Sequence, residues 1–295
     1  MIRVLITGAD SYIGVSFDEY AKKHYGTEIS VDTVDMRDNS WRAKDFSCYD
    51  AVYHVAGIAH VDVSNLTEEK KKQYYAVNTD LAIEAAKKAK KEGVKQFIFM
   101  SSALVYGDSA PYGKDKVIDR NTIPEPTSIY GDSKFKAEAG LNELSDADFN
   151  VAILRPPMIY GKNSKGNYPS LAKMASKLII FPNVKNQRSM LYIENLCEFL
   201  CQIMLRCESG IFWPQNAEYV NTCNMVKTIA EVKNHKICVG RAFNWLVALA
   251  SIIPGKTRTL ANKAFGNLCY DKSLSKFDFE YQIVDFKESI RRTEG

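Results

Sequence analysis

The sequence predicts an α/β fold, in which a doubly wound parallel sheet is followed by a smaller lobe towards the C-terminus. The first observation is a short apolar run at residues 2–6 that leads into a glycine turn and then a helix ending near His24. A continuous apolar run of this kind is typical of a parallel strand buried on both faces. The second observation is that strand-like and helix-like segments alternate along the chain with short loops between them. That alternation favours a doubly wound sheet.

The remaining elements follow from the same patterns. Further strands are expected at residues 29–34, 51–55, 96–100 and 151–155. Helices are expected at residues 66–93, 132–144, 165–178, 195–207 and 222–233, with an apolar helix before Pro254. The sheet domain is expected to comprise residues 1–160, with residues 183–208 returning to it. The smaller lobe is then expected to comprise residues 161–182 and 209–280.

The composition is that of an ordinary globular protein, with 46% apolar and 25% charged residues among 295. The net charge of +4 is too small, and the lysines are too scattered, to indicate a nucleic-acid partner. Seven cysteines without metal-ligand spacing suit free thiols in a reducing cytoplasm and indicate no metal site. The chain opens on a strand and not on a secretory signal, and the apolar run at residues 242–253 is too short to span a bilayer. We expect a buried helix there, with contact to a membrane surface as the weaker alternative.

The turn after the first strand has the sequence TGADSYIG at residues 7–14. A strand, a glycine turn and a helix together present backbone N–H groups to the pyrophosphate of a dinucleotide, at the positive end of the helix dipole. The residues expected to contact that cofactor are Gly8, Ser11, Tyr12, Ile13 and Gly14. A glycine turn without a ligand is the alternative, and the order strand, turn, helix, strand makes it the weaker one.

An acidic residue, Asp35, ends the second strand twenty-one residues after Gly14. A carboxylate at this position accepts hydrogen bonds from an adenosine ribose, and it would repel a 2′-phosphate. We therefore expect NAD as the cofactor in preference to NADP, although Arg37 nearby weakens the preference. The small residues Ala56 and Gly57 follow the third strand, where they would let the backbone approach the cofactor.

A candidate proton-transfer site combines Ser102 with Tyr130 and Lys134. The tyrosine and the lysine are four residues apart on an expected helix, so they lie on the same face. An ammonium beside a phenol favours the phenolate, and the pKa of Tyr130 is expected to fall towards neutral pH. The Ser102 hydroxyl, at the end of a strand, would hold the reacting oxygen at the same point. An ordinary amphipathic helix with a packed tyrosine and a solvated lysine is the alternative.

Together these motifs resemble the extended short-chain dehydrogenase/reductases and, more narrowly, the nucleotide-sugar 4-epimerases and 4-keto-sugar reductases. The resemblance rests on an ordered series: TGADSYIG, Asp35, HVAG at 54–57, Asn78, FMSSALVYG at 99–107, YGDSK at 130–134 and LRPPMIYG at 154–161. It continues through KGNYPSLAKMA at 165–175 and RSMLYIENL at 188–196. The resemblance implies a Rossmann-type sheet with a substrate-binding lobe, and a role in cell-surface polysaccharide biosynthesis.

The resemblance also implies a role for each matching residue. Tyr130 would be the acid/base, Ser102 would bond the substrate oxygen, and Lys134 would bond the nicotinamide ribose as well. The cofactor residues that it adds to the glycine turn are Asp35, Ala56, Gly57, Ser101 and Pro157, while Asn78 is structural. Asn167 and Arg188 would contact the diphosphate of a nucleotide sugar, and a surface salt bridge is the alternative for Arg188. Members of the family often pair through four helices, which implies a homodimer using residues 66–93 and 132–144.

The sequence departs from the family pattern at three points. Ser11 stands where the family prefers a middle glycine, so a hydroxyl would face the pyrophosphate. Only fifteen residues separate Asp35 from the third strand, so the adenine side is shortened, and Asp45 and Phe46 are the candidates for an acidic and apolar pair around adenine. The place of an asparagine that epimerases often carry is taken by Pro156, Pro157 and Met158.

One absence decides among reactions. Nucleotide-sugar 4,6-dehydratases place an Asp-Glu pair directly after the catalytic serine or threonine, whereas Ala103 and Leu104 follow Ser102 here. Neither side chain transfers a proton, so dehydration is not expected, and the resemblance then implies redox chemistry at C4 of the sugar. Because Asp35 is of the NAD type, we expect an NAD-dependent 4-epimerase of a UDP-hexose or UDP-N-acetylhexosamine, acting through a transient 4-keto sugar. An NAD(P)H-dependent 4-keto-sugar reductase is the close alternative. A non-catalytic dinucleotide sensor is a distant one, because such proteins usually lose a member of the Ser/Tyr/Lys set.

Overall fold

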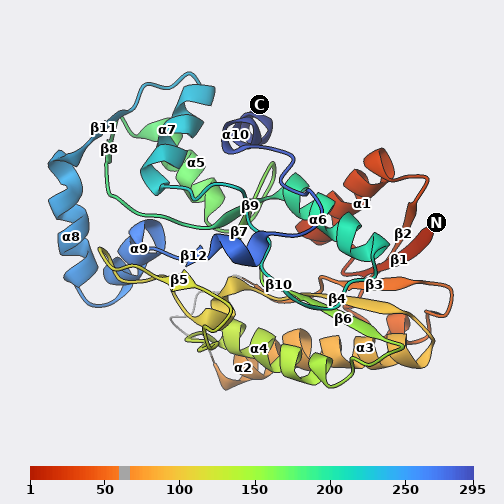
Figure 1. Cartoon of the computed structure of the whole chain (residues 1–295). Helices are drawn as coiled ribbons and strands as arrows, with labels where there is room; N and C mark the ends of the chain where they lie inside the picture. Colours follow the sequence, from red (N-terminus) through yellow and green to blue (C-terminus); the bar gives the residue numbers. More distant parts are fainter. Residues whose placement is uncertain (60–66) are drawn as a thin grey trace.

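A parallel six-stranded sheet forms the centre of the molecule (Figure 1). The structure is a computed structural model, and it describes residues 1–59 and 67–295. The strands lie in the order β10-β6-β4-β3-β1-β2. Their bounds are β1 (Ile2–Thr7), β2 (Ile29–Val34), β3 (Ala51–His54), β4 (Gln96–Met100), β6 (Asn150–Leu154) and β10 (Gly210–Phe212). The predicted doubly wound parallel α/β sheet is therefore confirmed.

Helices cover both faces of this sheet. α1 (Tyr12–His24) and α6 (Ile193–Leu205) lie on one face, and α2 (Glu68–Tyr75), α3 (Leu81–Lys91) and α4 (Ile129–Asn142) lie on the other (Figure 1). Alternate residues of β1 point to the two sides: Val4 and Ile6 join the core beneath α1 and α6, whereas Leu5 joins the core beneath α3 and α4. Because both faces are covered, every residue of the strand interior meets apolar neighbours, which explains the continuous apolar run.

The long helix expected at residues 66–93 is interrupted. α2 is followed by a π-helical turn at Ala76–Asp80 and then by α3, and residue 66 lies outside the described residues. The π-helical turn carries the buried Asn78, whose amide bonds both the N–H and the C=O of Ile58 and donates to Ser133 Oγ at 3.0 Å. Isolated π turns are often found where a functional site needs a side chain redirected. Here the turn fixes the chain just beyond β3.

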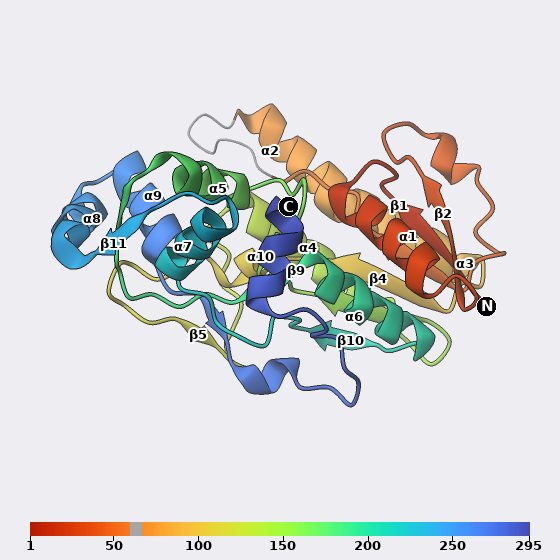
Figure 2. The same ribbon diagram turned by 90° about the horizontal axis from the view of Figure 1, so that it is seen from above.

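The C-terminal lobe lies beside one end of the sheet (Figures 1 and 2). Its helices are α5 (Tyr168–Lys177), α7 (Thr222–Val232), α8 (Asn244–Ile252) and α9 (Lys256–Phe265). Three parallel pairs of short strands accompany them: β5 (Val117–Ile118) with β12 (Cys269–Tyr270), β7 (Met158–Tyr160) with β9 (Met190–Tyr192), and β8 (Ile180–Pro182) with β11 (Cys238–Gly240). β10 does not belong to the lobe, because it pairs with β6 at the edge of the central sheet. The assignment of all of residues 209–280 to the lobe is wrong at this strand.

The apolar segment at residues 242–253 does not form the buried helix that we expected. It forms α8, in which Val247 is buried while Trp245, Leu249 and Ile252 are exposed. Within the described residues, no helix has both the length and the apolar character needed to cross a bilayer.

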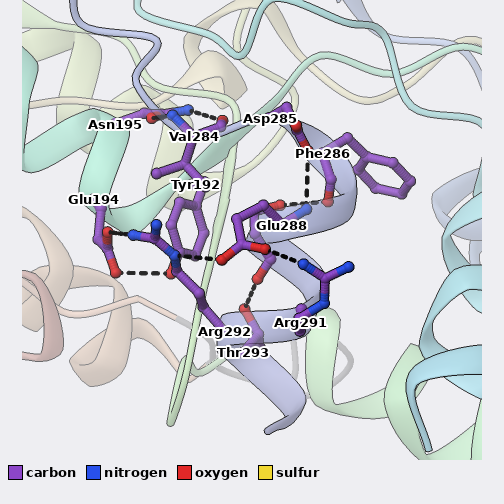
Figure 3. A network of polar contacts seen from close by, with 11 residues as sticks. Tyr192, Glu194, Asn195, Val284, Asp285, Phe286, Glu288, Arg291, Arg292 and Thr293 are labelled. Carbon is purple, nitrogen blue, oxygen red and sulfur yellow. Dashed lines mark hydrogen bonds and ion pairs between the residues drawn. The ribbon is translucent and has the colours of Figure 1, made fainter.

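A last helix, α10 (Phe286–Glu294), was not anticipated from the sequence (Figure 3). Asp285 caps it by accepting a hydrogen bond from the N–H of Glu288 at 2.9 Å. Arg292 bridges Glu288 on the same helix and Glu194 of α6, with its Nη1 lying 2.6 Å from the Glu194 carboxylate. Asn195 exchanges two hydrogen bonds of 3.0 Å with the backbone of Val284. These contacts attach the C-terminus to α6 and so to the central sheet.

Candidate active site

The winding of the sheet reverses at β1, because β2 pairs with one side of it and β3 with the other. Ligands of doubly wound sheets bind outside the carboxyl ends of the strands at such a reversal. Gly8 follows β1 with φ +110°, and a Cβ on it would lie 2.9 Å from the backbone nitrogen of Ala56. A Cβ on Gly57 would lie 3.0 Å from Asn78 Oδ1 and 3.3 Å from Lys134 Nζ. The turn after β1 therefore packs so closely against Ala56 that Gly8 cannot carry a side chain without a backbone shift, and a side chain on Gly57 would crowd Asn78 and Lys134.

The first turn of α1 offers donors to an anion. The Ser11 hydroxyl caps the helix by accepting a hydrogen bond of 3.0 Å from the N–H of Gly14. The N–H groups of Tyr12 and Ile13 make no hydrogen bond to the part of the chain that the structure describes. They point out of the positive end of a thirteen-residue helix, which suits a pyrophosphate. The Ser11 oxygen thus stabilises the start of α1, and the hydroxyl proton of Ser11 can still be donated to an anion.

Asp35 is partly exposed, and its carboxylate is already bound by Arg37. Arg37 Nε lies 3.0 and 2.8 Å from the two oxygens of its carboxylate, and Arg37 Nη2 also reaches Asp10 at 2.7 Å. The hydrogen bonds from Arg37 lower the pKa of Asp35 to about 2. The carboxylate is therefore charged at neutral pH, but a ribose hydroxyl would have to share it with the guanidinium. This competition supports the expectation that Arg37 weakens the preference for NAD over NADP.

Ser102, Tyr130 and Lys134 come together at the carboxyl edge. Ser102 follows β4 and caps a 3₁₀ turn at Ala103–Tyr106, accepting from the N–H of Leu104 at 3.1 Å. Its side chain lies close enough to the Tyr130 hydroxyl to lower the pKa of that tyrosine. Tyr130 lies in the first turn of α4, which Ser128 caps, and Lys134 lies one turn further on. The Lys134 ammonium donates to the carbonyl of Met100 at 2.8 Å and lies 4.5 Å above the Phe99 ring.

The pKa values at this edge differ from the sequence-based expectation. Burial raises the pKa of Tyr130 to about 12, while the hydrogen bond with Ser102 lowers it in part. Burial also lowers the pKa of Lys134 to about 8, and the charge of Glu138 opposes that shift. Lys134 does not depress the pKa of Tyr130, because its ammonium is directed to the end of β4. The expected fall of the Tyr130 pKa towards neutral is therefore wrong for the chain by itself, and Tyr130 holds its proton at neutral pH.

A buried network of polar side chains, which the sequence did not predict, supports this edge. Ser101 donates a short hydrogen bond to Glu138, which lies on α4 one turn beyond Lys134. Arg155 forms a buried ion pair with Glu138, with Nη2 and Oε2 at 2.5 Å, and donates to the Tyr106 hydroxyl at 2.6 Å. Ser101 therefore serves the network, since its hydroxyl is directed to Glu138. The regular spacing of Tyr130, Lys134 and Glu138 along one helix face was the signal that could have revealed it.

Two residues proposed for the adenine side do not reach the carboxyl edge. Asp45 and Phe46 precede β3, and Phe46 is fully buried, packed beside Trp41 with its N–H bonded to Glu92 at 2.6 Å. A ring without exposed surface cannot stack on a base. The exposed Asp45 accepts a hydrogen bond from the N–H of Ser47 at 2.8 Å. The contact between Phe46 and adenine is therefore withdrawn, because the apolar core takes the ring.

The remaining site residues lie on loops near the lobe. Pro157 is buried after β6, and the neighbouring Pro156 carbonyl accepts from the N–H of Ala103 at 2.9 Å. Asn167 is exposed and stands at the start of α5. Arg188 donates from Nη1 to the carbonyls of Lys263 and Gly266, at 2.6 and 3.1 Å.

A separate cavity of about 640 Å³ lies in the lobe, between α7, β8 and β11. It is lined by Asn183, Asn221, Cys223, Asn224, Lys227, Ile237, Cys238 and Val239. None of the residues proposed for catalysis lines it. Across the described residues, no group of three His, Cys, Asp or Glu side chains is placed to hold a metal ion.

Known proteins share the sequence pattern and the fold that carry this site. A model of the NAD dependent epimerase/dehydratase family matches residues 4–212. The chain belongs to this family. The prediction of its family is thereby confirmed, and the description of that family names NAD as the cofactor on which its members depend.

Two relatives and one solved structure illustrate the family. The chain is 35% identical over 185 residues to a UDP-glucose 4-epimerase of Vibrio cholerae, a match covering 61% of this chain but only 56% of that enzyme. It is 28% identical over 249 residues to an N-acetyl-α-D-glucosaminyl-diphospho-ditrans,octacis-undecaprenol 4-epimerase of Escherichia coli O157:H7, covering 78% of this chain and 71% of that one. The structure of a UDP-glucuronic acid 4-epimerase from Bacillus cereus in complex with NAD has a TM-score of 0.72 at 15% identity, covering 99% and 97% of the two chains. At that identity the likeness shows the fold alone.

Proposed function

We propose that this protein is an NAD-dependent 4-epimerase of a hexose or N-acetylhexosamine linked to a diphosphate, and that it acts through a transient 4-keto sugar. The observation that carries the proposal is the convergence of Ser102, Tyr130 and Lys134 at the carboxyl edge of the sheet, with Ser102 close enough to Tyr130 to lower its pKa and Lys134 one helical turn further along α4. Two curated relatives that act as 4-epimerases support the choice of reaction.

The residues at the reversal of the sheet fit a dinucleotide. Gly8 lets the turn after β1 pack directly against Ala56, and the N–H groups of Tyr12 and Ile13 are directed out of the start of α1, where a pyrophosphate would bind. Lys134 Nζ lies next to Gly57, where it can donate to a ribose hydroxyl as well as to Met100. Bound NAD would supply the hydride acceptor and donor.

Tyr130 then transfers the proton of the sugar oxygen at C4, and Ser102 donates a hydrogen bond to that oxygen. With a pKa of about 12, the phenol is protonated at neutral pH and can donate to a developing alkoxide. Oxidation of the C4 hydroxyl comes first and needs the phenolate: Tyr130 would release its own proton to solvent and accept the C4 hydroxyl proton as hydride passes to NAD, and it would return that proton when the hydride returns. The Ser102 hydroxyl lowers the cost of the phenolate and holds the reacting oxygen during both halves. Burial strengthens these contacts because it excludes water.

Arg188 and the start of α5 are the proposed contacts of the diphosphate. Arg188 Nη1 is fixed by two carbonyls, and its other guanidinium nitrogens make no hydrogen bond to the described residues. A guanidinium held on one side presents its other donors to a diphosphate with little loss of side-chain freedom. The substrates named for the two relatives, a UDP-hexose and a polyprenol-linked N-acetylglucosaminyl diphosphate, share this diphosphate. Of the two, we propose the UDP sugar as the substrate.

The test is to purify the protein, release and identify any bound dinucleotide, and incubate the holoenzyme with UDP-glucose, UDP-N-acetylglucosamine and the polyprenol-linked sugar. The proposal expects NAD to copurify and the C4 epimers of at least one sugar to interconvert without net NADH formation. Turnover of 4-keto sugars alone, with stoichiometric loss of NAD(P)H, would establish the reductase. Binding of NAD without turnover of any sugar would establish the sensor.

A further inference from the structure

The α8–α9 surface is an apolar face that no described residue covers. We define it by Trp245, Leu246, Leu249, Ile252, Ile253 and Leu260. Trp245, Leu249 and Ile252 recur at helical spacing along one side of α8 and are 63%, 49% and 72% exposed. Leu260 of α9 is 66% exposed. A contiguous apolar face of this kind marks an interaction site.

The surface is held in place by the lobe. Val247 is buried on the other side of α8, and Asn244 donates from its amide to the carbonyl of Asn183 at 2.9 Å. Figures 1 and 2 show α8 at the outer end of the lobe, at the far side of the molecule from the N-terminus. The apolar side chains are therefore presented outward from a fixed helix.

The sequence around this surface is strongly basic. Residues 232–270 contain no aspartate or glutamate and six cations, namely Lys233, Lys236, Arg241, Lys256, Arg258 and Lys263. This segment carries a formal charge of +6 in a chain whose net charge is +4, so the rest of the chain sums to −2. Arg241, Arg258 and Lys263 are exposed, and within the described residues none of them has a carboxylate at ion-pair distance. Their charges are available to an external anion.

We propose that the α8–α9 surface docks on a lipid bilayer that contains anionic phospholipids. A tryptophan with branched aliphatic neighbours suits the boundary between head groups and acyl chains, and exposed cations on flanking residues suit lipid phosphates. α8 has nine residues, so it lies in the interface and does not span it. Self-association through the same surface is disfavoured, because two copies would bring like charges together.

The docking would place the candidate diphosphate contact close to the membrane surface. The carbonyls that hold Arg188 belong to Lys263, in the last turn of α9, and to Gly266 directly after it. This last consequence rests on the proposed function. The docking itself does not, and it is measured without any sugar substrate.

The test uses the purified holoenzyme and sedimentation with vesicles of phosphatidylcholine alone or mixed with phosphatidylglycerol. The protein is expected to sediment with the mixed vesicles, to remain in the supernatant with phosphatidylcholine alone, and to be released by high salt. Tryptophan emission gives a second readout, because Trp41 and Trp213 are buried and Trp245 is the exposed one of the three. The emission is expected to shift to shorter wavelength with mixed vesicles, and Trp245→Phe is expected to remove the shift.

Two variants separate the contributions. The triple change Trp245→Ser, Leu249→Ser and Ile252→Ser, and separately Arg258→Gln with Lys263→Gln, are each expected to lower the vesicle-bound fraction about tenfold. The matched control is Ile123→Ser, since Ile123 is 76% exposed but lies outside the basic segment, and its binding should equal that of the wild type. Unchanged melting temperatures show that the variants are folded.

Three results would overturn the proposal. These are no binding to the mixed vesicles, equal binding by the triple variant, and equal binding to phosphatidylcholine alone. A wild type that is dimeric by light scattering and does not bind vesicles, with a monomeric triple variant, would assign the surface to a second copy of the chain.

Discussion

The carboxyl edge of the sheet and the α8–α9 surface differ both in the side chains that they present and in the way those side chains are held. At the edge, the polar groups are fixed by hydrogen bonds to the backbone: Lys134 donates to Met100, and Ser102 accepts from Leu104. On the α8–α9 surface, large apolar groups stand in solvent on a helix that is held from beneath. The difference teaches that the groups proposed to react are polar and held in place by hydrogen bonds, whereas the groups proposed to recognise a partner are apolar and exposed on a fixed helix. Substitutions should therefore divide into those that affect activity or stability and those that affect only binding.

The largest expected effect is on catalysis. Tyr130→Phe removes the group that transfers the proton but keeps the ring, so kcat for C4 epimerisation is expected to fall by about 10²–10⁴-fold. Tyr219→Phe is the matched control, because it removes a hydroxyl that donates only to the carbonyl of Tyr270 at 2.7 Å. Steady-state kinetics with equal NAD loading compares the two. A Tyr130→Phe enzyme with the kcat of the control would remove Tyr130 from the mechanism.

The next largest effect is on the free energy of unfolding, which should fall far more when a buried aromatic residue is replaced than when an exposed one is. Phe46 is fully buried, and Phe46→Ala is expected to lower the free energy of unfolding by about 3–5 kcal/mol through lost burial and a residual cavity. Trp245→Ala is expected to change it by less than about 0.5 kcal/mol, because Trp245 is exposed. Denaturant unfolding of both variants measures the contrast. Comparable losses would mean that α8 packs against something that covers Trp245.

The buried lysine predicts a pH dependence. The pKa of Lys134 is about 8 in the folded protein and 10.5 in an exposed lysine, so between these values the unfolded chain binds more protons. The free energy of unfolding of the wild type relative to Lys134→Met should therefore rise as pH increases from 8 to 10, by up to about 3 kcal/mol. Below pH 8 the difference should be flat, because lysine is protonated in both states. If the stability of the wild type relative to Lys134→Met fell as pH increases, the pKa of Lys134 would be raised in the folded protein and not lowered.

The smallest expected effect concerns cofactor choice. Arg37 occupies both oxygens of Asp35, and its charge would attract a 2′-phosphate. Arg37→Gln frees the carboxylate and removes that attraction, so discrimination in favour of NAD should increase a few-fold. Calorimetric titration of the cofactor-free protein with NAD and NADP gives the ratio. Stronger binding of NADP by the variant would show that Asp35 does not face the adenosine ribose.

The sequence predicted the parts of the molecule that local patterns encode. Apolar runs and glycine turns located five of the six central strands, and the spacing of Tyr130 and Lys134 placed both on α4. It could not predict interactions made by distant segments. The Glu138–Arg155 ion pair, β10 at the sheet edge and the burial of Phe46 beside Trp41 all depend on tertiary packing. The exposure of α8 could not be predicted for the same reason, because an apolar run has the same sequence pattern whether or not another surface covers it.

The central claim is that hydride leaves C4 and returns to C4 within one bound sugar. The most direct measurement is incubation of the holoenzyme with a UDP-hexose or UDP-N-acetylhexosamine carrying deuterium at C4, in ordinary water, followed by NMR of the epimeric product. The account predicts that the product keeps its deuterium at C4 and that the bound cofactor ends each turnover as NAD. Epimerisation in which solvent hydrogen replaces that deuterium would contradict it.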